Sequence, residues 1–204
     1  MVTADAAETF SRCMAVGGVA VFPADTVYGL ACEPDTPEAV RRLYALKGRR
    51  THKPAAVMFF RLDLALEALP ELGPRTRGAL ERLLPGAVTV LVPNPLRRFP
   101  LACGPDAPDV LGLRVPALPD ALAPLAAVSW PVLQSSANHA GGADARALAD
   151  VPEPIRARVD LLVDGGELAG TPSTVVDLTG YEADGRWTIV REGAVAAELV
   201  ARAL

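Results

Sequence analysis

Apolar residues in the first half of the chain alternate between the spacing of helices and that of strands. Thr3 to Val16 has the period of an amphipathic helix, with Thr3 placed to cap its first turn. Thr36 to Leu46 repeats this pattern, and Pro37 lies in its first turn. Between them, Val19 to Phe22 is a short apolar run typical of a buried strand. Further strands are expected at 55–60, 87–92, 110–115 and 132–134, and further helices at 74–84 and 119–127.

In the second half, strands follow one another with few helices between them. We expect strands at 161–163, 174–178 and 187–190, and a final helix at 194–204. Strands that interleave with helices early and succeed one another late indicate an α/β fold, with a twisted mixed parallel/antiparallel sheet flanked by helices. Half of the 204 residues are apolar and no low-complexity linker interrupts them, so a single domain over 1–204 is expected.

Composition narrows the class of protein. No basic leader precedes an apolar stretch, the apolar runs are too short to span a membrane, and the three cysteines have no paired spacing. These features predict a cytoplasmic protein with reduced thiols and no membrane contact. The P-loop, dinucleotide-binding and nucleophile-elbow signatures are absent. The two histidines lack metal-ligand spacing, so no metal site is predicted.

One basic segment stands out from the charge balance. The formal net charge of −4 argues against a wholly basic, nucleic-acid-coating surface. Residues 39–62 nevertheless contain seven Lys or Arg residues and no acid. Of the 20 Lys and Arg residues in the chain, only Lys47 and Lys53 are lysines, and both fall here. A compact ammonium suits different sites from a planar guanidinium, which favours a chemical role, while a solvated helix face is the simpler alternative.

Short polar clusters lie at the ends of expected elements, and the first follows a buried strand, where ligands usually bind in open α/β sheets. They span 22–30, 47–54, 135–142, 171–177 and 190–193. Thr26 and Tyr28 are expected on a loop after the first strand, although Asp25 and Thr26 could instead cap backbone amides in a turn. The cations of the second cluster can converge on one polyphosphate. Each cluster alone is weak evidence, because serine-rich and glycine-rich turns are common.

Taken in order, these clusters resemble the YrdC-like family. The motifs are Pro-x-Asp-Thr-Val-Tyr-Gly-Leu at 23–30, Lys-Gly-Arg at 47–49, Pro-Gly-x-x-Thr at 85–89, Arg-Val-Pro at 114–116, Ser-Ala-Asn at 136–138, Pro-Ser-Thr-Val-Val-Asp at 172–177 and Arg-x-Gly at 191–193. The resemblance implies a twisted mixed sheet with a concave, positively charged face. It also implies L-threonylcarbamoyladenylate synthase activity, a nucleotidyl transfer that forms threonylcarbamoyl-AMP and pyrophosphate from L-threonine, bicarbonate and ATP.

The resemblance further implies roles for individual residues. Those that would bind ATP are Lys47, Arg49, Lys53, Ser136, Asn138 and Arg191, with Lys47 and Arg49 also catalytic. Those that would bind threonine are Thr26, Tyr28, Arg114 and Ser173. ATP is expected as Mg-ATP, without a dedicated protein metal site. Carbamate attack on the α-phosphate needs no protein nucleophile, so positioning and charge neutralisation would carry the reaction.

Partners follow from the same resemblance. A downstream tRNA threonylcarbamoyl transferase would pass the threonylcarbamoyl group to the adenosine beside the anticodon. Direct contact with tRNA or double-stranded RNA is left open. Two other functions compete with this one: an RNA-binding YrdC-like protein without catalysis, and a carbamoyl-adenylate-forming enzyme with another acceptor. Few aromatic residues accompany the basic segment, which weakens the RNA-binding alternative.

Three positions depart from the family pattern. Ala24 stands where threonine is common, Arg50 where proline usually follows Lys-x-Arg, and Met58 where some relatives carry a histidine near the threonine. The last departure puts one substrate contact in question.

Two expectations concern single residues. Replacing Lys47 with alanine should remove most activity and leave thermal stability nearly unchanged, because a phosphate-binding lysine contributes little to the fold. Arg114 should grip a carboxylate through two parallel hydrogen bonds. The alternative for Arg114 is a structural ion pair with Asp106 or Asp109.

Overall fold

The computed structural model describes residues 1–48 and 53–204. Nine strands of these residues form one sheet in the order β7-β1-β2-β6-β3-β5-β4-β8-β9. They are β1 (Val19–Pro23), β2 (Tyr28–Cys32), β3 (Ala56–Met58), β4 (Val88–Pro93), β5 (Val110–Arg114), β6 (Val132–Ser136), β7 (Leu161–Leu162), β8 (Thr174–Asp177) and β9 (Thr188–Arg191). Three neighbouring pairs, β1–β7, β3–β5 and β4–β8, are parallel, and the other five are antiparallel. The predicted mixed sheet is confirmed.

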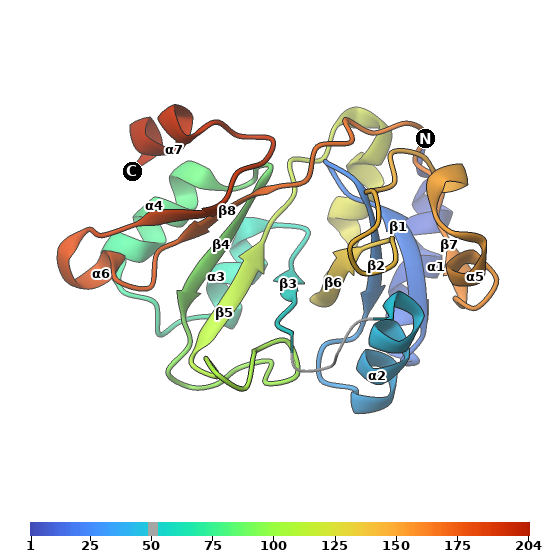
Figure 1. The fold of residues 1–204 in the computed structure, drawn as a ribbon, viewed down its shortest axis with the longest axis horizontal. Coiled ribbons are helices and arrows are strands. Elements are labelled where there is room, and N and C mark those ends of the chain that lie inside the picture. The colour runs from blue at the N-terminus through green and yellow to red at the C-terminus, as the bar shows by residue number, and fades with distance from the viewer. Residues whose placement is uncertain (49–52) are drawn as a thin grey trace.

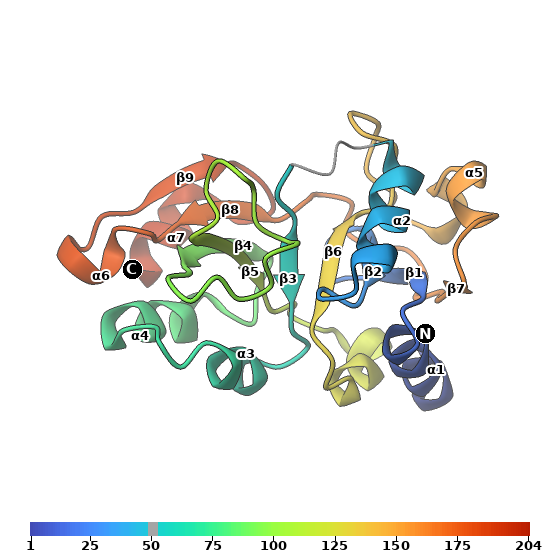
Figure 2. The same ribbon diagram turned by 90° about the horizontal axis from the view of Figure 1, so that it is seen from below.

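Helices cover both faces of this sheet. They are α1 (Ala4–Ala15), α2 (Pro37–Lys47), α3 (Leu62–Ala68), α4 (Pro74–Leu83), α5 (Glu153–Arg156), α6 (Tyr181–Asp184), α7 (Ala197–Ala203) and the 3-10 helices η1 (Asp120–Ala127) and η2 (Leu148–Asp150). Figure 2 shows α1, α3 and α4 along one side of the sheet, and α2 with α5 on the other. In Figure 1, β3 lies between two halves, and the chain crosses from one to the other on its way from β7 to β8.

Helix α1 forms where its cap and apolar spacing predict. The Thr3 hydroxyl oxygen accepts a hydrogen bond from a first-turn amide at 3.1 Å, which satisfies one of the unpaired donors of the helix N-terminus. The apolar face buries Phe10 and Met14. Phe10 packs against Phe22 and Phe60, with ring centroids 5.3 and 5.8 Å apart. These aromatic contacts anchor α1 to the sheet and add to the stabilisation from apolar burial.

Helix α2 places the first lysine of the basic segment. Pro37 starts the helix, because its fixed φ and missing N–H suit the first turn. Gly48 ends it with φ of 61°, a left-handed conformation that glycine adopts without a Cβ clash. Lys47 is therefore the last helical residue, and its side chain leaves α2 at the helix end.

Several elements differ from the sequence-based expectations: α3, α5, α6 and η2 were not expected, and α7 is shorter than the helix expected at 194–204. The segment expected to be a loop contains β2, which pairs antiparallel with β1 and is buried at every position. The sequence of β2 does not alternate between apolar and polar residues, because both faces of this strand are covered. Its tyrosine and glycine were therefore assigned to a loop. The helix expected at 119–127 is the 3-10 helix η1, since Pro124 inside it cannot donate an α-helical hydrogen bond. Strand β3 is shorter than the expected 55–60.

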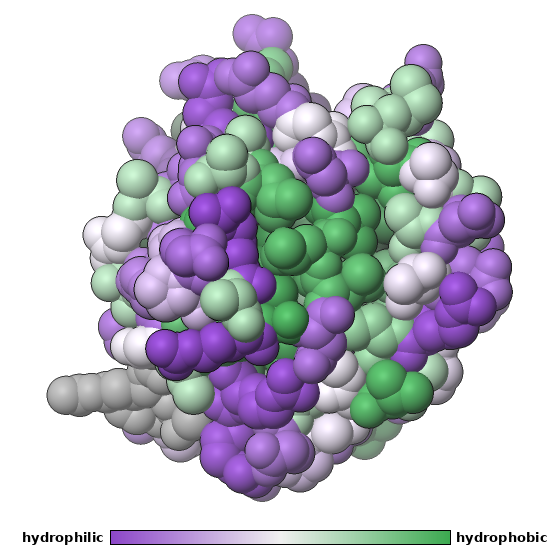
Figure 3. All heavy atoms as spheres, turned by 90° about the vertical axis from the view of Figure 1, so that its right-hand side faces the viewer, coloured by the Kyte–Doolittle hydropathy of each residue, from purple (hydrophilic) through white to green (hydrophobic). Residues whose placement is uncertain are grey.

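Apolar side chains also reach the surface. Figure 3 shows a shallow apolar hollow bordered by polar residues on the side that is at the right of Figure 1. The exposed large apolar residues include Val16, at 83% exposure, and Leu162 of the edge strand β7, at 42%. Across residues 1–48 and 53–204, no helix combines the length and the apolar character that a membrane crossing needs.

Candidate active site

A cavity of about 480 Å³ lies on one face of the sheet, across β6, β3, β5, β4, β8 and β9. Alternate residues of a strand point to the same face, so β5 contributes Val110, Gly112 and Arg114 to the cavity. Neighbouring strands contribute the residues paired with these. The paired residues are Gly112 with Ala56 and Leu91, Ala56 with Gln134, and Thr89 with Arg114 and Val175.

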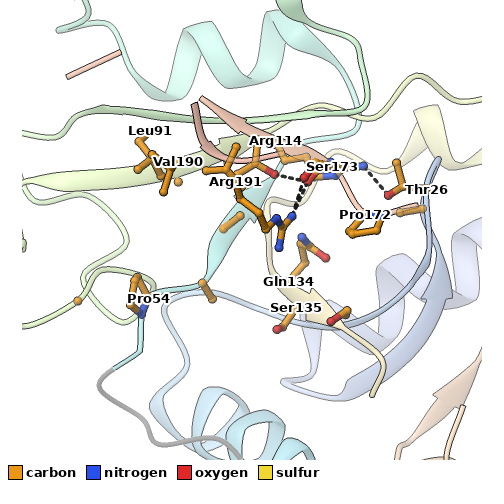
Figure 4. Close-up of a pocket in the computed structure, with 18 of the residues that line it drawn as sticks. Thr26, Pro54, Leu91, Arg114, Gln134, Ser135, Pro172, Ser173, Val190 and Arg191 are labelled. Carbon is orange, nitrogen blue, oxygen red and sulfur yellow. Dashed lines mark hydrogen bonds between the residues drawn. The ribbon is translucent and has the colours of Figure 1, made fainter. Parts of the chain in front are cut away.

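The two ends of the cavity differ chemically (Figure 4). Leu91 and Val190 lie at one end, and Thr26 with Pro172 at the other. The guanidinium of Arg191 reaches into the space between them, toward Gln134. The small residues of the floor, alanine and glycine, leave room for a ligand against the sheet. The arrangement suits an elongated ligand with an apolar portion, an anionic middle and a small polar group.

Arg114 is the more deeply buried of the two described arginines that line the cavity, with 1% of its surface exposed. Its Nη2 donates to the carboxylate of Asp25 and, at 3.0 Å, to the hydroxyl oxygen of Thr26. Its Nη1 is buried without a hydrogen-bond partner. Burial lowers the pKa of Arg114 and contact with Asp25 opposes that change, but a guanidinium stays charged at physiological pH. The ion pair considered with Asp106 or Asp109 is formed with Asp25 instead.

Ser173 and Arg191 form a second polar group in the cavity. The hydroxyl oxygens of Ser173 and Thr89 lie 2.8 Å apart, and both residues are buried. Arg191 Nη2 donates to the Ser173 carbonyl oxygen at 2.6 Å and to its hydroxyl oxygen at 3.3 Å. Arg191 itself is exposed. The guanidinium of Arg191 is held by Ser173 through Nη2 while the rest of it is open to solvent, so it can bind an anion that enters the cavity.

Lys47 links α2 to the end of β6. Its Nζ donates to the carbonyl oxygens of Ser136 and Asn138 at 2.5 and 3.1 Å, and lies 2.6 Å from Asn138 Oδ1 and 3.2 Å from Ser136 Oγ. Lys47 is 4% exposed and does not line the cavity, whereas Ser136 does. The two motifs Lys-x-Arg and Ser-x-Asn are therefore in direct contact. This burial argues against the expectation that Lys47 contributes little to stability.

The sequence comparison identifies the family. A family model for Sua5, YciO and YrdC proteins, described as "Telomere recombination", matches residues 12–193. The chain belongs to this Sua5/YciO/YrdC family. A threonylcarbamoyl-AMP synthase from Chromohalobacter salexigens is 36% identical over 168 residues, which cover 81% of this chain and 89% of that protein. A threonylcarbamoyl-AMP synthase from Pseudomonas aeruginosa is 33% identical over 186 residues, covering 87% and 95%.

Solved structures of the family share the fold. The structure of Pyrococcus abyssi Sua5 complexed with L-threonine superposes with a TM-score of 0.83 at 23% identity, covering all of this chain and 58% of that one. Escherichia coli YciO gives a TM-score of 0.77 at 24% identity, covering 97% of this chain and 94% of that one. The present chain thus spans little more than half the length of the Pyrococcus protein. At these identities the likeness establishes the fold of the Sua5/YciO/YrdC domain.

Tyr28 lies away from the cavity that holds most of the family motifs. It belongs to β2, not to a loop, and its side chain is fully buried. Its hydroxyl donates to the Gly166 carbonyl oxygen at 2.8 Å, lies 3.1 Å from Asp164, and accepts from the Gly165 amide at 3.0 Å. Burial raises the pKa of Tyr28 to about 12, although the Gly165 amide opposes the increase. Tyr28 anchors the segment that follows β7, and the structure gives no support to threonine contact.

The remaining predicted site residues and two of the positions that depart from the family pattern lie outside the cavity lining or outside the described residues. Lys53 is exposed and lies next to the cavity-lining Pro54, outside the lining itself. Asn138 is buried beneath Ser136 and bonded to Lys47. Arg49 and Arg50 lie outside the described residues. Met58 is fully buried and does not line the cavity.

The basic segment carries less net charge than its sequence indicates. Acids that lie outside residues 39–62 pair with three of its arginines. The pairs are Arg41 with Glu38, Arg42 with Asp160 at 2.9 Å, and Arg61 with Asp63 at 2.6 Å. The first and third pairs are local and exposed, and contribute little to stability. Pairing of these arginines further weakens the case for a nucleic-acid surface built on this segment.

Sequence reasoning missed several residues that line or support the cavity. Gln134 lines the floor, and strand alternation from Ser136 could have placed it on the same face. Thr89 was recognised within a motif, but its contact with Ser173 joins residues 84 positions apart and has no local signal. Asp25 does accept a backbone amide, as a turn would predict, but the donor is the distant Ala117, at 3.0 Å.

Proposed function

We propose that this chain catalyses L-threonylcarbamoyladenylate synthesis. Threonine and bicarbonate give N-carboxythreonine and water. A carbamate oxygen then bonds to the α-phosphorus of ATP, and the bond from that phosphorus to the leaving pyrophosphate breaks. The observation that carries the proposal is one cavity with the buried Arg114 at one end and an apolar surface at the other. The names of the relatives at 33% and 36% identity support the same activity.

The amino-acid end is assigned to Arg114, Thr26 and Ser173. Arg114 has a buried nitrogen without a partner, and a carboxylate is the ligand that best satisfies a guanidinium. The hydroxyls of Thr26 and Ser173 border the same end and can contact the small polar side chain of threonine. Tyr28 is left out of this assignment, because its hydroxyl is engaged behind β2.

The nucleotide end is assigned to the apolar surface and the cations beside it. Leu91, Val110 and Val190 offer apolar contact to an adenine ring. The guanidinium of Arg191 lies between this surface and the amino-acid end, where the α-phosphate would react. Ser136 lines the same cavity, and its hydroxyl is assigned to the nucleotide. Lys53 is exposed next to the cavity-lining Pro54 and is assigned to the phosphates with Arg49, which lies outside the described residues. Lys47 with Asn138 would fix the Ser136 loop, and Lys47 would reach a phosphate by exchanging one of its present bonds.

The proposed chemistry asks little of the protein beyond placement and charge. Both reactants are anionic, so their approach is opposed until cations neutralise them. Arg114 and Arg191, which both line the cavity, would supply positive charge on either side of the reacting atoms. Holding the carbamate and the α-phosphorus together replaces a bimolecular encounter with a near-unimolecular step.

The metal and the partners complete the proposal. No group of three or more metal-ligating side chains occurs among residues 1–48 and 53–204. Mg²⁺ would be carried by the nucleotide phosphates. The product is a mixed anhydride that must be handed on, so we place a tRNA threonylcarbamoyl transferase downstream, in the cytoplasm. Direct binding of tRNA is not required by this scheme.

A pyrophosphate-release assay tests the function. Release should require ATP, bicarbonate and L-threonine together, and omission of any one should reduce it to background. Serine, valine and glycine replace threonine in parallel reactions. Release that is equal with these acceptors would favour a carbamoyl-adenylate-forming enzyme of another specificity. Absence of release under all conditions, with tight binding of double-stranded RNA, would favour the RNA-binding alternative.

A further inference from the structure

Asp25 lies behind the cavity wall and contacts the residue that faces the ligand. Its side chain is 5% exposed, and it does not line the cavity. One carboxylate oxygen accepts from Arg114 Nη2, and the other accepts from the Ala117 backbone amide at 3.0 Å. Ala117 follows β5, whereas Asp25 follows β1, so this single carboxylate ties together two segments that border the cavity.

The contact between Arg114 and Thr26 can have only one donor and one acceptor assignment. A guanidinium has donors only, so the Thr26 oxygen must accept the hydrogen from Arg114 Nη2. The hydroxyl proton of Thr26 is then left for an acceptor, and Thr26 lines the cavity. Because both hydrogens of Nη2 are used, Arg114 keeps the buried, unpartnered Nη1 for a ligand. Thr26 and Arg114 therefore both offer donors to whatever binds at this end.

We propose that Asp25 is a positioning residue for the amino-acid carboxylate. It holds the guanidinium of Arg114 in the orientation that turns Nη1 and the Thr26 hydroxyl toward one anionic acceptor. The ligand class is a free α-amino acid with an ionised carboxylate. This inference rests on the proposed function and adds a residue that acts on the ligand only through Arg114.

Asp25→Asn is the variant that tests the role. Asparagine has nearly the same shape, but an NH2 donor replaces one oxygen, so it cannot reproduce the contacts with Arg114 and Ala117, which use separate carboxylate oxygens. In steady-state pyrophosphate release, the KM for threonine should rise about tenfold or more, the scale of one lost oriented contact. The KM for ATP should stay within about twofold, because Asp25 does not touch the nucleotide end.

Asp160→Asn is a matched control from outside the cavity. Asp160 also accepts from a backbone amide, that of Val19 at 2.7 Å, and pairs with an arginine, Arg42. Its replacement should lower Tm without changing the KM for threonine. If Asp25→Asn behaves like Asp160→Asn, with lower Tm and unchanged KM for threonine, Asp25 is merely structural and the proposal is overturned.

A second variant decides the matter should Asp25→Asn not fold. Asp25→Glu keeps the charge but lengthens the side chain by one methylene, which displaces the guanidinium. It should raise the KM for threonine at an almost unchanged KM for ATP, and an unchanged KM for threonine would refute the positioning role. The wild-type protein separates the two ideas. Threonine-independent behaviour of the wild type would refute the proposed function, whereas normal wild-type kinetics with inert Asp25 variants would refute only the role of Asp25.

Discussion

Lys47→Met removes an ammonium while keeping most of the aliphatic side chain. The ammonium sits at the end of α2 and is bonded to both residues of the Ser-x-Asn motif. Methionine occupies a similar volume without any donor, so the change in stability reports the hydrogen bonds and not a cavity. The sequence alone predicted a loss of activity at constant stability. The structure predicts that both will fall.

The size of the effect follows from the acceptors that lose their donor. The carbonyl oxygens of Ser136 and Asn138 accept hydrogen bonds from Lys47 Nζ at 2.5 and 3.1 Å. Lys47 is only 4% exposed, so these acceptors are shielded from water. Leaving a buried acceptor unpaired costs about 1–3 kcal/mol each, so about 3 kcal/mol in total is expected after some repair by water. For a protein of this size, about 2–4 °C of Tm per kcal/mol gives a decrease of about 6–12 °C.

Differential scanning fluorimetry and pyrophosphate release measure the two outcomes. Lys53→Met is the control for stability, because Lys53 is the other lysine of the chain and is exposed. Its Tm should change by no more than a surface substitution does, about 0.5 kcal/mol or less. An unchanged Tm for Lys47→Met would refute the structural role of the ammonium. Lower Tm with full turnover at a temperature where the variant is folded would refute its contribution to catalysis.

Three further substitutions test the site. Arg114→Lys keeps the charge but loses the planar fork, so threonine use should weaken by about 2–5 kcal/mol while the KM for ATP moves far less. Separate titrations of threonine and ATP check this, and an equal increase in both KM values would show that the carboxylate site is not at Arg114. Tyr28→Phe should lower stability by about 1 kcal/mol in urea unfolding and leave both KM values unchanged. Gly112→Ala should weaken ATP binding in calorimetry at nearly unchanged Tm, because the added Cβ has only ordinary contacts, 3.4 Å or more, with Ala55 and Ala56. Full ATP affinity would contradict the placement of the nucleotide.

The fold was predictable where local patterns decide it. Thr3 capped α1 as expected, and Pro37 started α2, which runs one residue beyond the expected end at Leu46. Prediction failed where tertiary burial overrides local pattern. Strand β2 is covered on both faces and follows a polar turn, so neither alternation nor composition marks it. The segment expected to be an α-helix forms the 3-10 helix η1, because Pro124 has no amide hydrogen to donate. The apolar spacing on which the prediction rested does not take this missing donor into account.

The site was predictable as a set of motifs but not as a set of contacts. The order of motifs named Thr26, Arg114, Ser136, Ser173 and Arg191, and all five line one cavity. The pairing of the buried arginine was not accessible, since its acid lies 89 residues away and the nearer acids in sequence are not its partners. Register across the sheet, which no local pattern encodes, decides which side chains meet.

The two faces of β5 carry separate tasks. Val110, Gly112 and Arg114 border the cavity, while Leu111 and Leu113 between them have no exposure and belong to the core. Natural variation at the first set can alter ligand preference without disturbing core packing, and variation at the second set can tune stability without reaching the ligand. A few substitutions at the cavity-facing positions of β5 can therefore change which substrate the domain uses while the core packing stays the same.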